Sequence, residues 1–144
     1  MGLFFKKPTA TDKKEANAAL SRMKTCFKKM ETGNSIDSYF TTWQKYTTEY
    51  ELLKGYEQKG VKLTMSSKKM HLAVTAEVPR IEKETVQRGY DRLQRDMAKL
   101  STDAGKAKKA NAFFSELEFY YPRLKPSTVE YIQSLRASCP YMSD

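Results

Sequence analysis

The chain has 144 residues, with 26 Lys and Arg against 17 Asp and Glu, and a formal net charge of +9. This length predicts a single domain over residues 1–144, and no stretch approaches the roughly 20 apolar residues of a membrane-spanning helix. The two cysteines lie far apart and the chain starts without an apolar signal region, which argues against a secreted disulfide scaffold. We therefore expect a reducing intracellular compartment, cytoplasmic or inside an organelle.

A helix is predicted at about 12–32, after an apolar and basic leader over residues 1–11. The pattern Asp12-x-x-Glu15 is typical of a helix start, and Gly33 is a natural stop. The apolar stripe at spacings of three and four consists of Ala16, Ala19, Leu20, Met23, Phe27 and Met30.

A second helix is expected from Asn34 or Ser35 to Gly60, with a stripe that is aromatic rather than aliphatic. Only two or three residues connect it to the first helix. Because such short connections join antiparallel neighbours, the sequence predicts an antiparallel helix hairpin.

Residues 61–78 are open to two interpretations. Apolar and polar residues alternate in two arms on either side of Ser66–Lys69, which favours a small β-hairpin. The alternative is a helix capped by Ser66 or Ser67 and kinked by Pro79, with Met70, Val74, Val78 and Ile81 on one face. The strict alternation leads us to expect the hairpin.

A third helix is expected at about 80–100, and its apolar register continues to Tyr121. The shared phase predicts one rod of about 40 residues or two helices joined by a bend near residue 103, rather than a reversal. A last helix should follow Pro126, opened by a Ser127-x-x-Glu130 capping box. The expected fold is a mostly α-helical bundle: a helix hairpin and a long bent third helix within 12–121, then a capping helix and tail over 122–144.

Catalytic machinery is not recognisable in the sequence. The single histidine, His71, has no Cys or carboxylate at metal-ligand spacing, and the common hydrolase, redox and phosphate-loop motifs are missing. Cys26 lies among Lys24, Lys28 and Lys29, and cations lower a thiol pKa; its place beside the apolar stripe instead predicts a small buried hydrophobe. We expect a non-enzymatic protein without catalytic residues, metal, cofactor or small-molecule substrate.

Basic residues concentrate near the start, where residues 1–33 hold eight Lys and Arg against three Asp and Glu. At a membrane surface, apolar side chains enter the acyl boundary while lysines meet anionic headgroups. The residues expected to serve this role are Leu3, Phe4, Phe5, Lys6, Lys7, Lys13, Lys14, Lys24, Lys28 and Lys29. Alternatively, the three apolar residues of the leader pack into the protein's own bundle or against a neighbouring subunit. A nucleic-acid-binding protein that uses the same lysines is a further, less favoured alternative, because no recognised nucleic-acid motif accompanies them.

Aromatic residues crowd the segment 113–121, and they cannot all face inward with Phe114, Leu117 and Tyr121. Phe113, Phe119 and Tyr120 are therefore expected on a second face, as a protein–protein interface; the alternative is a helix buried on two sides. The sequence thus predicts a helical scaffold or accessory subunit that binds other protein subunits, with an anionic membrane surface as a second partner.

Overall fold

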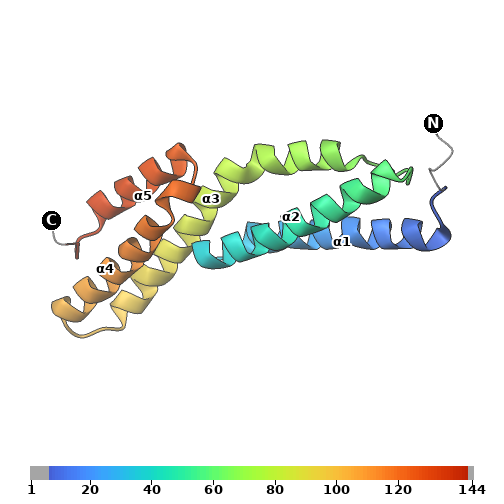
Figure 1. Ribbon diagram of the computed structural model, residues 1–144. Coiled ribbons are helices and arrows are strands. Elements are labelled where there is room, and N and C mark those ends of the chain that lie inside the picture. Colours follow the sequence, from blue (N-terminus) through green and yellow to red (C-terminus); the bar gives the residue numbers. More distant parts are fainter. Residues whose placement is uncertain (1–6, 143–144) are drawn as a thin grey trace. The chain divides into compact units, whose positions relative to one another are not determined.

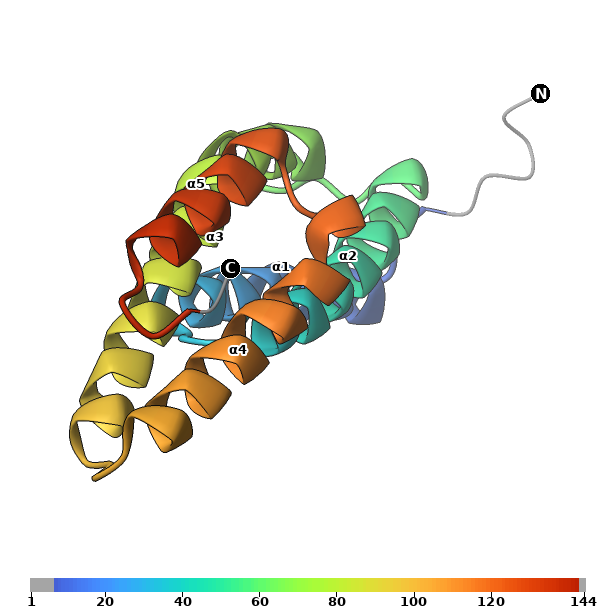
Figure 2. The same cartoon turned by 90° about the vertical axis from the view of Figure 1, so that its left-hand side faces the viewer.

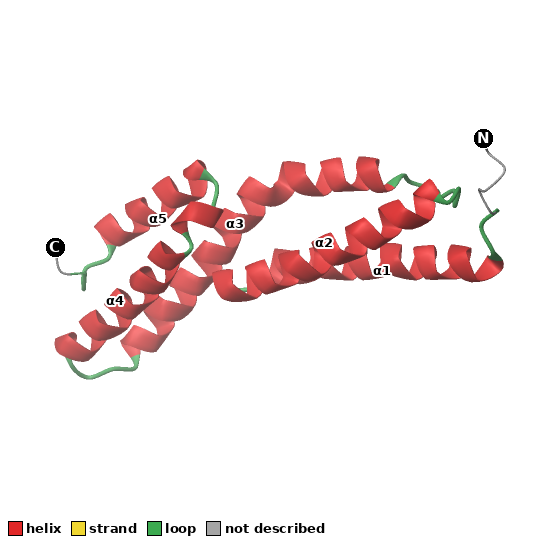
Figure 3. Ribbon diagram, viewed as in Figure 1, coloured by secondary structure: helices red, strands yellow, loops and turns green. Residues whose placement is uncertain are grey.

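The computed structural model describes residues 7–142, and over that range it contains helices and loops but no strand (Figures 1 and 3). The α-helices are α1 (Ala10–Thr32), α2 (Ile36–Gln58), α3 (Ser67–Ala98), α4 (Asp103–Phe119) and α5 (Pro126–Ser138), and a short 3-10 helix, η2 (Tyr121–Arg123), precedes α5. The predicted class, a mostly α-helical bundle, is confirmed.

The described residues group into two compact units. Unit 1 contains residues 7–30 and 40–77, and unit 2 contains residues 31–39 and 78–142. Helices α1, α2 and α3 each contribute residues to both units, whereas α4, η2 and α5 lie in unit 2. A single domain over 1–144 stays a prediction.

Unit 1 is built on the antiparallel hairpin of α1 and α2, as the sequence predicts (Figure 1). The Tyr56 hydroxyl donates to Glu15, and Arg22 pairs with Glu49 at 2.6 Å, so sequence numbers fall along one helix as they rise along the other. Its core comes from the predicted stripes and from the start of α3. The buried apolar residues of unit 1 include Ala16, Ala19, Leu20, Met23, Met30, Tyr46, Leu53, Met70 and Val74.

The ends of the helices in unit 1 follow from local hydrogen bonds. The backbone N–H of Thr9 donates to Asp12 and the N–H of Asp12 donates to the Thr9 hydroxyl, both at 3.0 Å. This reciprocal cap starts α1 at Ala10, two residues before the predicted start at the Asp12-x-x-Glu15 pattern. At the end of α2, Gly60 adopts a φ of 101°, which favours glycine, and the next N–H, of Val61, donates back to the Tyr56 carbonyl.

The expected β-hairpin at 61–78 is wrong, because α3 begins at Ser67. The N–H of Lys69 donates to the hydroxyl of Ser66 at 3.2 Å, which caps the helix as the alternative interpretation required. The helical face of Met70, Val74, Val78 and Ile81 is at most 7% exposed, whereas Leu72, on the other face, is 60% exposed. Burial of the four-residue stripe outweighs the alternating pattern, and Pro79 lies inside α3.

In unit 2 the chain reverses between α3 and α4, so the expected rod or gentle bend is wrong (Figures 1 and 2). Lys109 pairs with Asp96 at 3.9 Å, and the Tyr90 and Phe114 rings lie 6.0 Å apart, which fixes an antiparallel pair. Thr102 caps α4 by accepting from the Gly105 N–H at 3.1 Å. The regular spacing of apolar residues from about 80 to 121 arises because α3 and α4 each bury an apolar stripe. It does not mean that the two segments form one straight helix.

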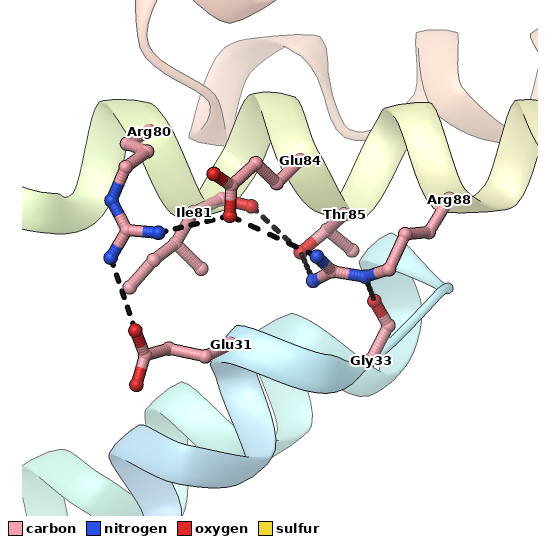
Figure 4. Close-up of polar contacts among 7 residues, drawn as sticks. All are labelled: Glu31, Gly33, Arg80, Ile81, Glu84, Thr85 and Arg88. Atoms are coloured by element: carbon pink, nitrogen blue, oxygen red, sulfur yellow. Dashed lines mark hydrogen bonds and ion pairs between the residues drawn. The ribbon is translucent and has the colours of Figure 1, made fainter.

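The turn between α1 and α2 belongs to unit 2, where two arginines hold it on α3 (Figure 4). Arg80 reaches both Glu31, at 3.1 Å, and Glu84, at 2.9 Å. Arg88 donates to the carbonyl of Gly33 at 2.7 Å. In this way α3 supplies charged hydrogen-bond donors to a side chain at the end of α1 and to the backbone carbonyl just after it.

A buried carboxylate of α3 caps α5. Glu82 is 2% exposed and accepts from the Lys125 N–H at 3.0 Å, the Thr128 hydroxyl at 2.7 Å and the Tyr39 hydroxyl at 3.3 Å. The predicted Ser127-x-x-Glu130 capping box is wrong: α5 starts at Pro126 and its N-cap, Lys125, has no side-chain cap. Among the described helices, none is long and apolar enough to cross a membrane.

Candidate anion-binding site

Positive charge is unevenly divided between the two units. The described residues of unit 1 include 13 Lys and Arg against 6 Asp and Glu, whereas those of unit 2 include 12 against 10. Unit 1 therefore carries a formal charge of +7 and unit 2 a formal charge of +2. An excess of positive charge attracts anions to the surface that carries it, so we expect anions to be drawn to unit 1.

Four exposed lysines form what we call the basic face of α1: Lys13, Lys14, Lys24 and Lys28. At 100° per residue they fall within about 100° of arc around the helix. This arc lies outside the buried stripe that Met23 and Met30 belong to. Lys7 is exposed just before α1, while the predicted membrane residues Leu3, Phe4, Phe5 and Lys6 lie outside the described residues.

Beside the basic face, α1 and α2 line an open groove of about 350 Å³ in unit 1. With Lys13 placed at 0° around the helix axis, the basic face spans about 0° to 100°. The groove residues of α1 lie next to this face, at about 120° to 220°. We call it the α1–α2 groove; it is lined by Arg22, Thr25, Cys26, Lys29, Lys45, Thr48 and Glu49. Three cations and one carboxylate give the lining a formal charge of +2.

The polar groups of the groove are held in defined positions. The Nε–H of Arg22 donates to Glu49 at 2.6 Å, so the single carboxylate is already paired with a cation. The hydroxyls of Thr25 and Thr48 donate to the carbonyls of Ser21 and Gln44, at 3.1 and 3.0 Å. Each hydroxyl oxygen keeps lone pairs that can accept a further hydrogen bond.

Cys26 is a half-buried thiol on the wall of this groove. Burial raises the pKa of this thiol and outweighs the opposing effect of Lys29; Glu49 adds a smaller increase and Lys45 a smaller decrease. The lysines thus fail to produce the lowered pKa of an activated thiol. Cys26 is a half-buried neutral thiol, nearer to the structural interpretation than to the reactive one.

An aromatic stack lies elsewhere in unit 1, between α2 and the start of α3. The ring of His71 stacks on Tyr50 at 4.1 Å, and Trp43 stacks on Tyr46 at 5.0 Å. The Tyr46 hydroxyl lies 3.2 Å from Nδ1 of His71, and burial, helped by Lys54, lowers the pKa of this histidine. These rings cover one another, so the stack joins α2 to α3.

A second cavity, of about 250 Å³, lies in unit 2 between α3, α4 and the α1–α2 turn. Its floor is apolar and includes Phe113 and Leu117. Asp96 lies 4.0 Å from Arg92 and 3.9 Å from Lys109, so the two basic residues at its rim share a carboxylate. This compensation makes the unit 2 cavity a weaker anion site than the α1–α2 groove.

The predicted interface residues are found in three different environments. Phe119 is 77% exposed, as an interface residue should be. Phe113 is half-buried and packs edge-on against Phe114 at 5.0 Å. Tyr120 is only 8% exposed and its hydroxyl donates to Asp37 at 2.6 Å, so its ring is not available to a partner.

Sequence reasoning placed Lys29 and Cys26 in a basic segment but missed their partners on α2. No local motif marks Lys45, Thr48, Glu49 or Arg22, so the sequence alone assigns these residues no role. The signal lies in the antiparallel register, since a pairing of residue 22 with residue 49 sets 26 opposite 45.

Among residues 7–142, no three His, Cys, Asp or Glu side chains gather into a metal-ion site. The sequence matches no protein-family model, and comparison with curated proteins and with solved structures finds no match either.

Proposed function

We propose that the protein is a non-enzymatic accessory or scaffold subunit that docks on an anionic membrane surface through unit 1. The observation that carries this proposal is the basic face of α1, four exposed lysines on one arc of the most cationic unit. Lysines near an anionic bilayer contribute about 1 kcal/mol each, so four on one side of a helix supply a reversible attachment.

The test is sedimentation of the full chain with phosphatidylcholine vesicles, with and without phosphatidylserine. Binding should require phosphatidylserine and weaken steeply as NaCl rises above about 0.1 M, where the Debye length falls below about 10 Å. Equal binding to both vesicle types would contradict the proposal. Tighter, salt-sensitive binding to a random DNA or RNA oligonucleotide would favour the nucleic-acid alternative instead.

The protein-partner part of the proposal rests on Phe119, which places an exposed aromatic ring at the end of α4. A ring exposed to this extent gains by burial against another protein. A photo-reactive residue at position 119 should form a discrete protein adduct in cells, and one at the exposed Glu130 should not. The same adducts from both positions, or none from position 119, would argue against this interface.

A further inference from the structure

We infer that the α1–α2 groove binds the phosphomonoester of a phosphorylated polyol headgroup at the membrane surface. This deepens the proposed function and rests on it: the basic face of α1 would bring the protein to the bilayer, and the groove would select one class of lipid.

The charge of the groove fits a phosphomonoester better than other anions. Arg22, Lys29 and Lys45 face one carboxylate, Glu49, which Arg22 already pairs at 2.6 Å. The resulting charge of +2 matches a phosphomonoester, which carries about −1.5 to −2 at neutral pH. A carboxylate or a phosphodiester brings only one negative charge and would leave the lining under-compensated.

The donors come from two helices, so they surround a ligand. The guanidinium of Arg22 donates its Nε–H to Glu49, which holds the planar group at the wall of the groove and leaves its amino N–H groups as further donors. Lys45 stands across the groove on α2, and Lys29 lies two turns beyond Arg22 on α1. Such an arrangement suits the oxygens of a tetrahedral phosphate.

The threonines add a preference for hydroxyls beside the phosphate. The hydroxyls of Thr25 and Thr48 donate to backbone carbonyls, so they can act toward a ligand only as hydrogen-bond acceptors. A phosphate oxygen accepts as well and gains nothing from them. Hydroxyl groups of a sugar or inositol ring would donate to these oxygens, which favours a polyol phosphate over free phosphate.

The position of the groove supports a headgroup rather than a dissolved metabolite. Thr25 and Lys29 of the groove come next around the helix after Lys28 and Lys14, so a bilayer docked on that edge of the basic face lies beside the groove. The volume of about 350 Å³ accommodates a headgroup of one phosphorylated ring.

The first experiment compares vesicles that contain phosphatidylinositol 4-phosphate with vesicles that contain phosphatidylserine at equal total charge. The wild-type chain should bind the phosphoinositide vesicles at least about tenfold more tightly. The groove variant Lys29→Gln/Lys45→Gln should lose this preference, while its phosphatidylserine binding falls no further than that of a control that removes equal charge elsewhere in unit 1. The control Lys62→Gln/Lys68→Gln removes the same charge from exposed positions of unit 1 outside the groove and should keep the preference.

Equal binding at matched charge, or a preference that survives in the groove variant, would overturn the inference and leave the proposed function standing. Binding to neither vesicle would instead refute the proposed function. Whether the groove binds a phosphomonoester is then tested by a second measurement that needs no membrane.

That measurement uses the thiol on the groove wall. In the wild-type chain, alkylation by iodoacetamide is followed at Cys26 by peptide mass spectrometry, with the buried Cys139 as internal reference. Inositol 4-phosphate should slow labelling of Cys26 several-fold, whereas NaCl at equal ionic strength should not. An unchanged rate at saturating inositol 4-phosphate would overturn the inference whatever the vesicles show.

Discussion

Gly89 of α3 marks the closest approach between that helix and the turn after α1. A Cβ at this position would lie 2.8 Å from the carbonyl oxygen of Asn34 and 3.3 Å from the ring of Phe113. The first atom belongs to the backbone of a turn that Arg88 also binds, so it has little freedom to move. The missing side chain is thus what allows unit 2 to pack the turn against α3.

Gly89→Ala should therefore destabilise the protein although alanine is the better helix former. Overpacking costs about 1–3 kcal/mol, against a gain of at most about 1 kcal/mol from helix propensity. Gly55→Ala is the matched control, because Gly55 lies within α2 and a Cβ there meets nothing within 4 Å. Thermal unfolding followed by circular dichroism should show a lower midpoint for Gly89→Ala and an equal or higher one for Gly55→Ala. A Gly89→Ala midpoint at or above wild type would contradict the close packing.

At the scale of elements, α5 depends on a residue 43 positions earlier in the chain. Glu82 accepts from the Lys125 N–H and the Thr128 hydroxyl, so the first turn of α5 is capped by α3 rather than by its own side chains. The Tyr131 hydroxyl donates to Gln87 one turn further along both helices. These bonds fix the direction and the register of α5 on α3.

Glu82→Leu should loosen this attachment. The Lys125 N–H and the Thr128 hydroxyl both donate to Oε1 of Glu82, and a leucine offers them no acceptor. A buried donor left without its acceptor costs about 1–3 kcal/mol, which urea unfolding should detect as a lower midpoint. The control Glu84→Gln removes an exposed partner of Arg80 and should cost less than about 1 kcal/mol. Equal losses for both variants would argue against a capping role.

The sequence predicts the elements that rest on local patterns and misses those that rest on distant contacts. The stripes of α1 and α2 are regular enough to yield both helices and their hairpin. In residues 61–78 the apolar residues fit both the two-residue repeat of a strand and the four-residue spacing of a helix. Burial of Val74 and Val78 on one helical face decides in favour of the helix. The cap of α5 is invisible locally because Glu82 supplies it from α3.

The same distinction applies to the candidate site. The lysines of α1 are evident from composition, and their common face follows from the helical period. The groove requires knowledge of which α2 residues lie opposite, which the pairing of Arg22 with Glu49 reveals only in three dimensions. The burial of Tyr120 likewise depends on Asp37, 83 positions away.

At the scale of the whole molecule, the two units divide the charge in a way that the net value of +9 conceals. Unit 2 carries nearly as many cations as unit 1 but balances them with carboxylates of its own, as Arg80 and Lys109 illustrate. Interactions with an anionic surface are screened beyond about a Debye length, so the local excess of one unit matters more than the total.

Two charge reversals that change the net charge equally should therefore have unequal effects. Lys13→Glu/Lys24→Glu alters the basic face of α1, and Lys99→Glu/Lys108→Glu alters exposed lysines of unit 2. At about 1 kcal/mol per lysine near the bilayer, with added repulsion from each new carboxylate, the first variant should bind phosphatidylserine vesicles about 30-fold to 1,000-fold more weakly. The second variant should stay within about threefold of wild type at 0.1 M salt, because its charges belong to unit 2 and lie outside the basic face of α1. Circular dichroism checks that both variants fold. Comparable losses in the two variants would mean that net charge alone governs attraction, and the basic face would then have no special role.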